Sequence, residues 1–199
     1  MIALPVAPAS APKRQLFVGT ALISAAIAMF FGGMLAIFLK LRDASPLAPN
    51  VTKRPSHVWL PKGVEIPQVP SNIMLITLAF ACVLITGAII SAKQDNHTST
   101  ALMLFLCAIM AIATINAQAL VYKRMAMSLR GGTYQVLFYT ITGAFLACLI
   151  GALAYSLTTA FRYLGGRTKD HDVLISLATY WYVITAVFTV IWFVIYVTK

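Results

Sequence analysis

The sequence predicts an all-α integral membrane protein, a bundle of five transmembrane helices. Hydrophobic residues make up 60% of the 199 residues and charged residues only 10%. So few charges cannot cover the surface of a soluble globule of this size. Five apolar stretches also reach the ~20 residues that a helix needs to cross a hydrocarbon core about 30 Å thick. Any function must therefore lie within the membrane or at its two surfaces.

The chain divides into a short leader and one membrane domain. Residues 1–15 are rich in Pro and Ala and have no helical periodicity, which is typical of a mobile or partner-bound segment. Residues 16–199 form a single transmembrane domain. The first apolar stretch follows Lys13 and Arg14 but is longer than the ~15 residues of a signal-peptide core, so it should remain as a helix. The helices are predicted at residues 16–39, 72–92, 100–121, 136–161 and 173–198.

The connections between these helices leave no room for a soluble catalytic domain. Six prolines in residues 42–72 exclude a continuous helix there and favour extended backbone on the membrane surface, with Trp59 at the level of the lipid headgroups. The other three connections are short polar or glycine-containing turns. Consecutive helices are therefore expected to be antiparallel neighbours.

The net charge of +10 does not indicate a nucleic-acid partner, because Lys and Arg are spread over the helix ends without forming one stripe. Lipid headgroups and partner subunits are the expected contacts. Of the 15 basic residues, six fall on the face that carries the N-terminus and nine on the other face. By the positive-inside rule this count favours an N-terminus outside the cell.

The predicted spans lack the groups that proton pumps and haem sites use. Every acidic residue and every histidine falls in a connection, so neither a carboxylate nor an imidazole is available within a span. Cys82, Cys107 and Cys148 fall in separate parts of the spans and are interpreted as small buried residues. His171, between Asp170 and Asp172, is interpreted as part of a solvated turn, or alternatively as a group that collects protons at the membrane surface.

A few small and amide residues within the spans predict helix packing. Gly143, Ala147 and Gly151 recur at four-residue spacing on one face of the fourth helix, which lets another backbone approach closely. Asn116 and Gln118 need hydrogen-bond partners across the bundle. They are interpreted as links between helices, or alternatively as part of a ligand-binding or conduction path.

Motifs in each span resemble one known family. The first span contains "VGTALISAAIAMFFGG", and the first connection runs through "HVWLPKGVEIPQVPSNIMLITLA". The later spans contain "AQALVYK", "YQVLFYTITGAFLAC" and "YWYVITAVFTVIWFVIY". In this order, the motifs are similar to those of subunit III of the haem-copper cytochrome c and quinol oxidases, in the five-helix bacterial form. The chain is a divergent member by this comparison.

The differences from the family pattern are all of one kind, the replacement of an ionisable residue by a neutral one. Positions that carry ionisable residues in the family are neutral here. Glutamates are replaced by Ile27 and Val121, histidines by Phe145, Cys148 and Tyr182, and an aspartate by Thr185. Charged groups within lipid are costly, and packed apolar residues can replace them without loss of stability. A packing role is therefore expected to survive where a proton-linked role does not.

The resemblance implies a non-catalytic subunit of a bacterial terminal oxidase. Such a subunit binds no cofactor or metal itself, packs against catalytic subunit I and other oxidase subunits that carry haem and copper, and organises membrane phospholipids. It implies an inner-membrane location with the N-terminus in the cytoplasm, against the charge count, and it assigns a lipid-phosphate contact to Arg162. Two alternatives stay open: an accessory subunit of a related nitric oxide reductase, and a small transporter or channel.

Overall fold

A computed structural model describes residues 14–45, 59, 67–125, 132–166 and 171–197, and the predicted leader therefore lies almost wholly outside the described residues. The five helices are α1 (Arg14–Asp43), α2 (Gln68–Lys93), α3 (His97–Met125), α4 (Thr133–Leu164) and α5 (His171–Ile191), and α5 continues into a short π-helix, η1 (Trp192–Val197). All five are long and apolar enough to cross a membrane, and the described residues include no strand. The predicted fold class is confirmed.

Each helix begins before its predicted first residue, and the first four also end later than predicted. The reason is that hydropathy detects only the part of a helix within the hydrocarbon. The 32 residues of α4 span about 48 Å at 1.5 Å per residue, more than the ~30 Å of a bilayer core. Its ends therefore extend into the headgroup regions.

Glycines set the ends of α4. Gly132 precedes the helix with φ of 147°, and Gly166 follows it with φ of 81°. Residues that carry a side chain rarely adopt these backbone angles, so α4 lies between two positions that favour glycine. A third turn, between α2 and α3, places Asp95 at φ of 56°.

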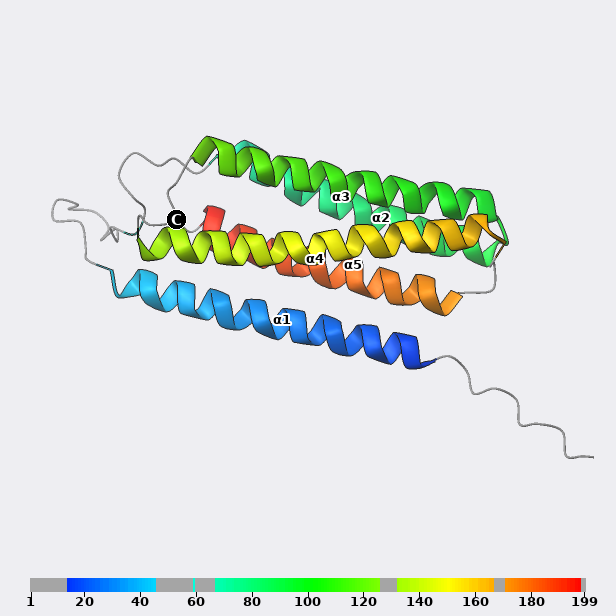
Figure 1. Cartoon of the computed structure of the whole chain (residues 1–199), viewed down its shortest axis with the longest axis horizontal. Coiled ribbons are helices and arrows are strands. Elements are labelled where there is room, and N and C mark those ends of the chain that lie inside the picture. The colour runs from blue at the N-terminus through cyan, green and yellow to red at the C-terminus, as the bar shows by residue number, and fades with distance from the viewer. Residues whose placement is uncertain (1–13, 46–58, 60–66, 126–131, 167–170, 198–199) are drawn as a thin grey trace, which may run out of the picture.

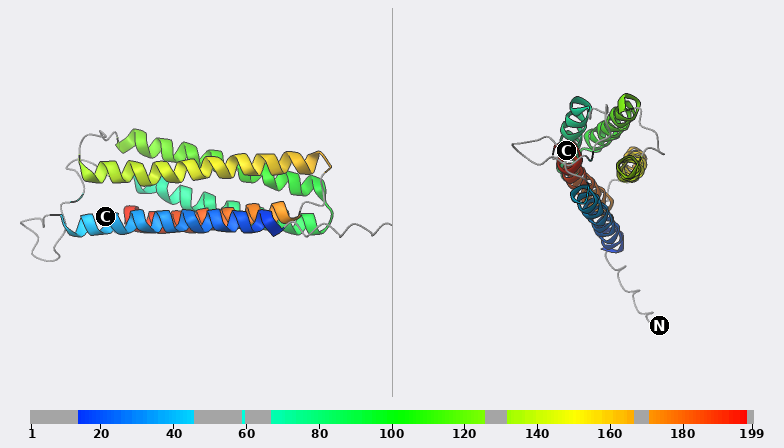
Figure 2. Two further views of the ribbon diagram at one scale, coloured as in Figure 1. Left: turned by 60° about the horizontal axis from the view of Figure 1, so that its bottom comes forward. Right: turned by 90° about the vertical axis from the view of Figure 1, so that its left-hand side faces the viewer.

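The helices lie side by side with α5 in a central position (Figure 1). α5 packs against α1, α2 and α4, whereas α3 packs against α2 and α4. Viewed along the bundle, α1 lies on the far side of α5 from α2 and α3 (Figure 2). α1 is thus a peripheral helix that rests chiefly on α5, and its Met29 side chain is 78% exposed.

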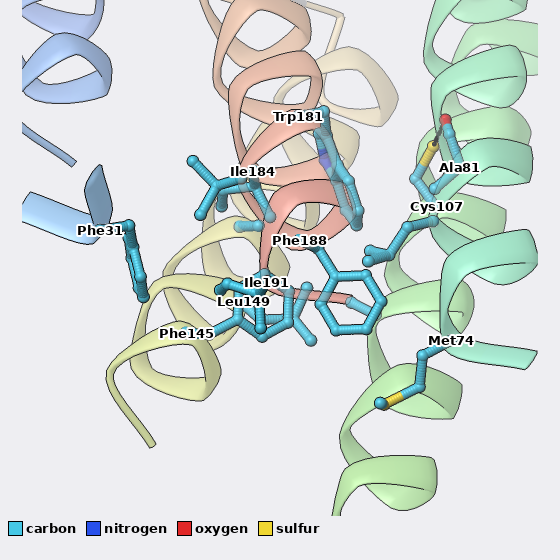
Figure 3. Close-up of a cluster of buried hydrophobic side chains, with 14 of the residues drawn as sticks. Phe31, Met74, Ala81, Cys107, Phe145, Leu149, Trp181, Ile184, Phe188 and Ile191 are labelled. Atoms are coloured by element: carbon cyan, nitrogen blue, oxygen red, sulfur yellow. Dashed lines mark hydrogen bonds between the residues drawn. The ribbon is translucent and has the colours of Figure 1, made fainter. Parts of the chain in front are cut away.

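The core consists of large apolar side chains around α5. Phe145 of α4 and Phe188 of α5 pack with ring centroids 4.9 Å apart, and Trp181 is completely buried. Figure 3 shows this cluster, with Phe31 of α1 on one side and Met74 of α2 on another. Each of these side chains is at most 2% exposed. Because lipid is as apolar as the core, tight packing is what holds these helices together.

The most extensive contact between two helices is that of α2 with α3. Buried alanines line both helices at this contact: Ala81, Ala88, Ala92, Ala101, Ala108 and Ala111. A methyl group added at Gly87 would lie only 2.8 Å from the Met103 sulfur. Small side chains thus bring α2 and α3 together.

Candidate functional site

Several neutral hydrogen bonds connect α5 to its neighbours, and four of them involve side chains between Tyr180 and Thr185. The Trp181 indole Nε1 donates to the Ser156 hydroxyl of α4 over 3.0 Å, and the Tyr180 hydroxyl donates to the Cys148 carbonyl over 2.9 Å. On the α2 side, the Tyr182 and Thr86 hydroxyls are 2.8 Å apart. Cys82 Sγ donates to Thr185 Oγ1 over 3.2 Å. These four bonds join α5 to α4 and α2 through neutral groups.

Two of these bonds involve family positions that have lost their ionisable groups. The motif resemblance predicted that Tyr182 stands in the place of a histidine and Thr185 in the place of an aspartate, and each bonds to a neutral side chain of α2. Interhelical hydrogen bonds of this kind contribute only about 0.6 kcal/mol each within a membrane. Both polar links between α2 and α5 are therefore made by neutral side chains.

The other altered positions are filled by packing. Val121 is completely buried, and Phe145, at 2% exposure, packs on Phe188. Ile27 and Cys148 are half-buried, and Ile27 packs against the core. Apolar or weakly polar side chains thus fill four positions that the motif resemblance assigned to two glutamates and two histidines of the family.

The face of α4 formed by Gly143, Ala147 and Gly151 approaches another described helix only at its Gly151 end. Gly143 is half-buried with no atom within 4 Å of an added methyl group, and Ala147 is exposed. Gly151 is also exposed, but a methyl group there would lie 3.2 Å from the Tyr180 hydroxyl. A contact of this face with a partner chain stays a prediction. The tight small-residue contact is instead between α2 and α3, where alanines seven residues apart (Ala81 and Ala88, Ala101 and Ala108) were the available signal.

The two amides of α3 do not act as links between helices. Asn116 is exposed, because its position on α3 points away from the bundle. Gln118 is only 1% exposed, yet neither of its amide atoms has a hydrogen-bond partner among the described residues. Spacing alone could not have revealed this, since residues two apart on a helix face almost opposite directions. The Tyr122 hydroxyl, which donates to Thr142 Oγ1 over 2.8 Å, makes the α3–α4 link instead.

Arg162 and His171 lie near the same end of the bundle, where α4 ends and α5 begins. Arg162 is half-buried in the last turn of α4. His171 lines a groove of about 240 Å³ together with Lys93 and three apolar residues, Ile89, Leu174 and Ile175. A second, larger groove of about 470 Å³ lies between α1 and α5 and is lined by Phe17, Val18, Asp172 and Ile175.

Within the described ranges, no group of three or more His, Cys, Asp or Glu side chains gathers as metal ligands would. Asp170, the other predicted neighbour of His171, lies outside the described residues. The three cysteines are free thiols. Cys107 is buried and donates to the Ala81 carbonyl over 3.5 Å (Figure 3).

Taken together, the fold and these contacts define a five-helix membrane bundle that is held by apolar packing and by neutral interhelical hydrogen bonds. A family model described as cytochrome c oxidase subunit III matches residues 9–199. The chain belongs to this family, as its motifs predicted. Members of the family are generally non-catalytic subunits of an oxidase complex, associate with its other subunits and carry no redox cofactor of their own. A search of curated proteins finds no match to the chain.

Proposed function

We propose that the chain is the subunit III component of a bacterial terminal oxidase, and that it stabilises catalytic subunit I and organises phospholipid beside it. Haem and copper belong to the partner subunits. The protein lies in the bacterial inner membrane with its N-terminus in the cytoplasm. The family match over residues 9–199 is the observation that carries this proposal. The sequence of the catalytic partner would separate an oxidase from a related nitric oxide reductase as the parent complex.

The packing of the altered positions supports a stabilising role rather than a proton-carrying one. Phe145 and Val121 are buried among apolar side chains, and Tyr182 and Thr185 bond to neutral partners. A proton relay within a membrane needs groups that exchange protons, such as carboxylates or imidazoles. The sequence pattern predicted all of these groups in the connections, and in the described helices they lie only at the ends, at Asp43, His97, His171 and Asp172.

The grooves at one end of the bundle support the lipid role. The groove beside His171 combines apolar walls with the ammonium group of Lys93 at its rim. An apolar wall suits an acyl chain, and a rim cation suits an anionic headgroup. Arg162 at the end of α4 lies at the same end of the bundle. Together these residues fit an anionic phospholipid.

A transporter or channel has less support. Asn116 and Gln118 were the amides interpreted from the sequence as the start of a polar path in this alternative. Asn116 is exposed and Gln118 is buried, so they lie on different sides of α3 and share no path.

Oxygen consumption during continuous turnover tests the stabilising role. The complex would be purified from cells with the gene and from cells without it, and its activity would be followed over many catalytic cycles. We expect similar initial rates and a faster loss of activity without the chain, because subunit I loses its packing partner. Equal lifetimes of the two preparations would contradict the proposal.

The lipid role predicts a specific effect of Arg162→Gln. A basic residue near an anionic headgroup contributes about 1 kcal/mol, so the substitution should lower retention of anionic phospholipid roughly fivefold. Mass spectrometry of lipids that co-purify with the complex measures this. Arg124→Gln, which removes an exposed cation at the end of α3, is the matched control and should change retention little. Equal losses in the two variants would indicate general charge attraction rather than a site.

A further inference from the structure

One end of the bundle contains deeply buried polar side chains without partners. Gln118 and Tyr196 are each 1% exposed, and Tyr134 is 4% exposed. Within the described part of the chain, both amide atoms of Gln118 and the hydroxyl oxygens of both tyrosines lack any hydrogen-bond partner. Nearly all buried polar groups in proteins have a partner, so four unpartnered atoms in one region require an explanation.

These side chains come from three different elements, and the two tyrosine rings pack against Phe138. The Tyr134 ring stacks on Phe138 with centroids 6.1 Å apart, and the Tyr196 ring packs edge-on against Phe138 at 6.3 Å. The Gln118 amide lies beside the hydroxyls of Tyr122 and Tyr196, but it does not reach regular hydrogen-bond geometry with either. α3, α4 and η1 thus contribute one buried polar side chain each at the same end of the bundle.

Two properties of the region favour an enclosed ligand. Lipid offers no hydrogen bonds, so polar groups inside a membrane bundle can be satisfied only from within it. In addition, Tyr196 belongs to a π-helix, a rare conformation that occurs frequently at functional sites. The unpartnered groups include both donors and acceptors, since an amide offers both and a phenol hydroxyl can act as either.

We propose that Gln118, Tyr134 and Tyr196 form a binding site for ordered water inside the membrane-spanning bundle. Water is the small ligand that donates and accepts at once, and a buried water molecule typically makes about three hydrogen bonds to otherwise unsatisfied groups. Here it would accept from a tyrosine hydroxyl and donate to Gln118 Oε1. It would join α3, α4 and η1 where no direct bond does. This inference is independent of the proposed oxidase role.

A structure of the intact complex, at a resolution that shows water, tests the site directly. We expect a density peak about 3 Å from the Gln118 amide and within the same distance of the Tyr134 or Tyr196 hydroxyl. Two results would overturn the proposal. One is well-defined side chains with no peak between them, and the other is a Gln118 amide bonded directly to Tyr122 or Tyr196.

A pair of amide-to-leucine variants tests the same site in solution. Gln118→Leu removes the amide that would hydrogen-bond to the bound water, so it should lower the thermal unfolding midpoint of the purified complex by a few degrees. Asn116→Leu makes a comparable change two residues away on the exposed side of α3 and should leave the midpoint unchanged or raise it. If the region is dry, Gln118→Leu instead removes an unsatisfied group and raises the midpoint, which would overturn the proposal.

A double-mutant cycle provides a second readout. Gln118→Leu and Tyr196→Phe should be non-additive, because each removes a partner of the same water molecule. The matched cycle combines Asn116→Leu with Tyr196→Phe and should be additive. Additivity in both cycles would contradict a shared water.

Discussion

The two parts of the last helix satisfy their polar side chains in different ways. From Tyr180 to Trp192, the tyrosine, tryptophan and threonine side chains each have a protein partner, ending with Trp192 Nε1, which donates to Asn72 Oδ1 over 2.9 Å. Four residues later, the Tyr196 hydroxyl is buried and, among the described residues, has none. The polar side chains from Tyr180 to Trp192 are thus satisfied by the protein itself, whereas the buried Tyr196 hydroxyl near the end of the π-helix can still accept a hydrogen bond from a small polar ligand or donate one to it.

This contrast separates two tasks of one helix. The body of α5 fixes the bundle, because its bonds to α2 and α4 accompany buried aromatic packing. The π-helix at the end of α5 carries the Tyr196 hydroxyl, which has no hydrogen-bond partner among the described residues. Variants in the body should therefore change stability in proportion to the packing that they remove.

The largest effect is expected from Trp181→Ala. Truncation of a fully buried tryptophan typically costs about 3–5 kcal/mol, and here it also removes the partner of the Ser156 hydroxyl. The free energy of unfolding in mixed micelles measures the loss. The control is Phe193→Ala, which removes an aromatic side chain that is 54% exposed. This substitution should lower the free energy of unfolding far less. Similar losses would show that α5 is not the packing centre of the bundle.

A smaller effect is expected from Gly151→Leu. The new side chain would collide with the Tyr180 hydroxyl and disturb its bond to the Cys148 carbonyl, at a cost of about 1–3 kcal/mol. Gly143→Leu adds the same side chain where no atom lies within 4 Å, so unfolding of the isolated chain should change little.

The intact complex extends this comparison. If the small face of α4 meets a partner helix, Gly143→Leu should weaken retention of the chain in the complex without altering the isolated chain. Retention during size-exclusion chromatography measures this effect. Unchanged retention would show that this face of α4 is not part of the contact with a partner subunit.

The smallest effect is expected from Thr86→Val. This variant loses the bond to Tyr182, and membrane hydrogen bonds of this kind are worth about 0.6 kcal/mol on average. Thr77→Val is the control, because the Thr77 hydroxyl bonds only the carbonyl of its own helix at Ile73. Equal unfolding free energies for the two variants would show that the Thr86–Tyr182 bond does not contribute to stability.

The sequence was sufficient for the class and the spans, because hydropathy and helix length depend only on local composition. It was not sufficient for contacts between helices. Tyr182 and Thr86 are 96 residues apart, and nothing in their local patterns connects them. The small residues of α4 and the alanines of α2 and α3 have similar spacing, but only the latter make the tight contact within the chain.

The amides show the same limit at the level of single residues. Asn116 and Gln118 looked equivalent in the sequence, since both are polar groups in one span. Their difference depends on which face of α3 the other helices cover, and that is a property of the assembled bundle.

Co-purification with absorbance spectroscopy tests the central claim most directly. The full chain, tagged at a terminus and purified gently from its native membrane, should bring down a large haem-bearing chain, and the haem absorbance should follow that chain when the two are separated. Isolation of a stable homo-oligomer without a haem-bearing partner, or haem absorbance that stays with this chain alone, would contradict an accessory role in a terminal oxidase.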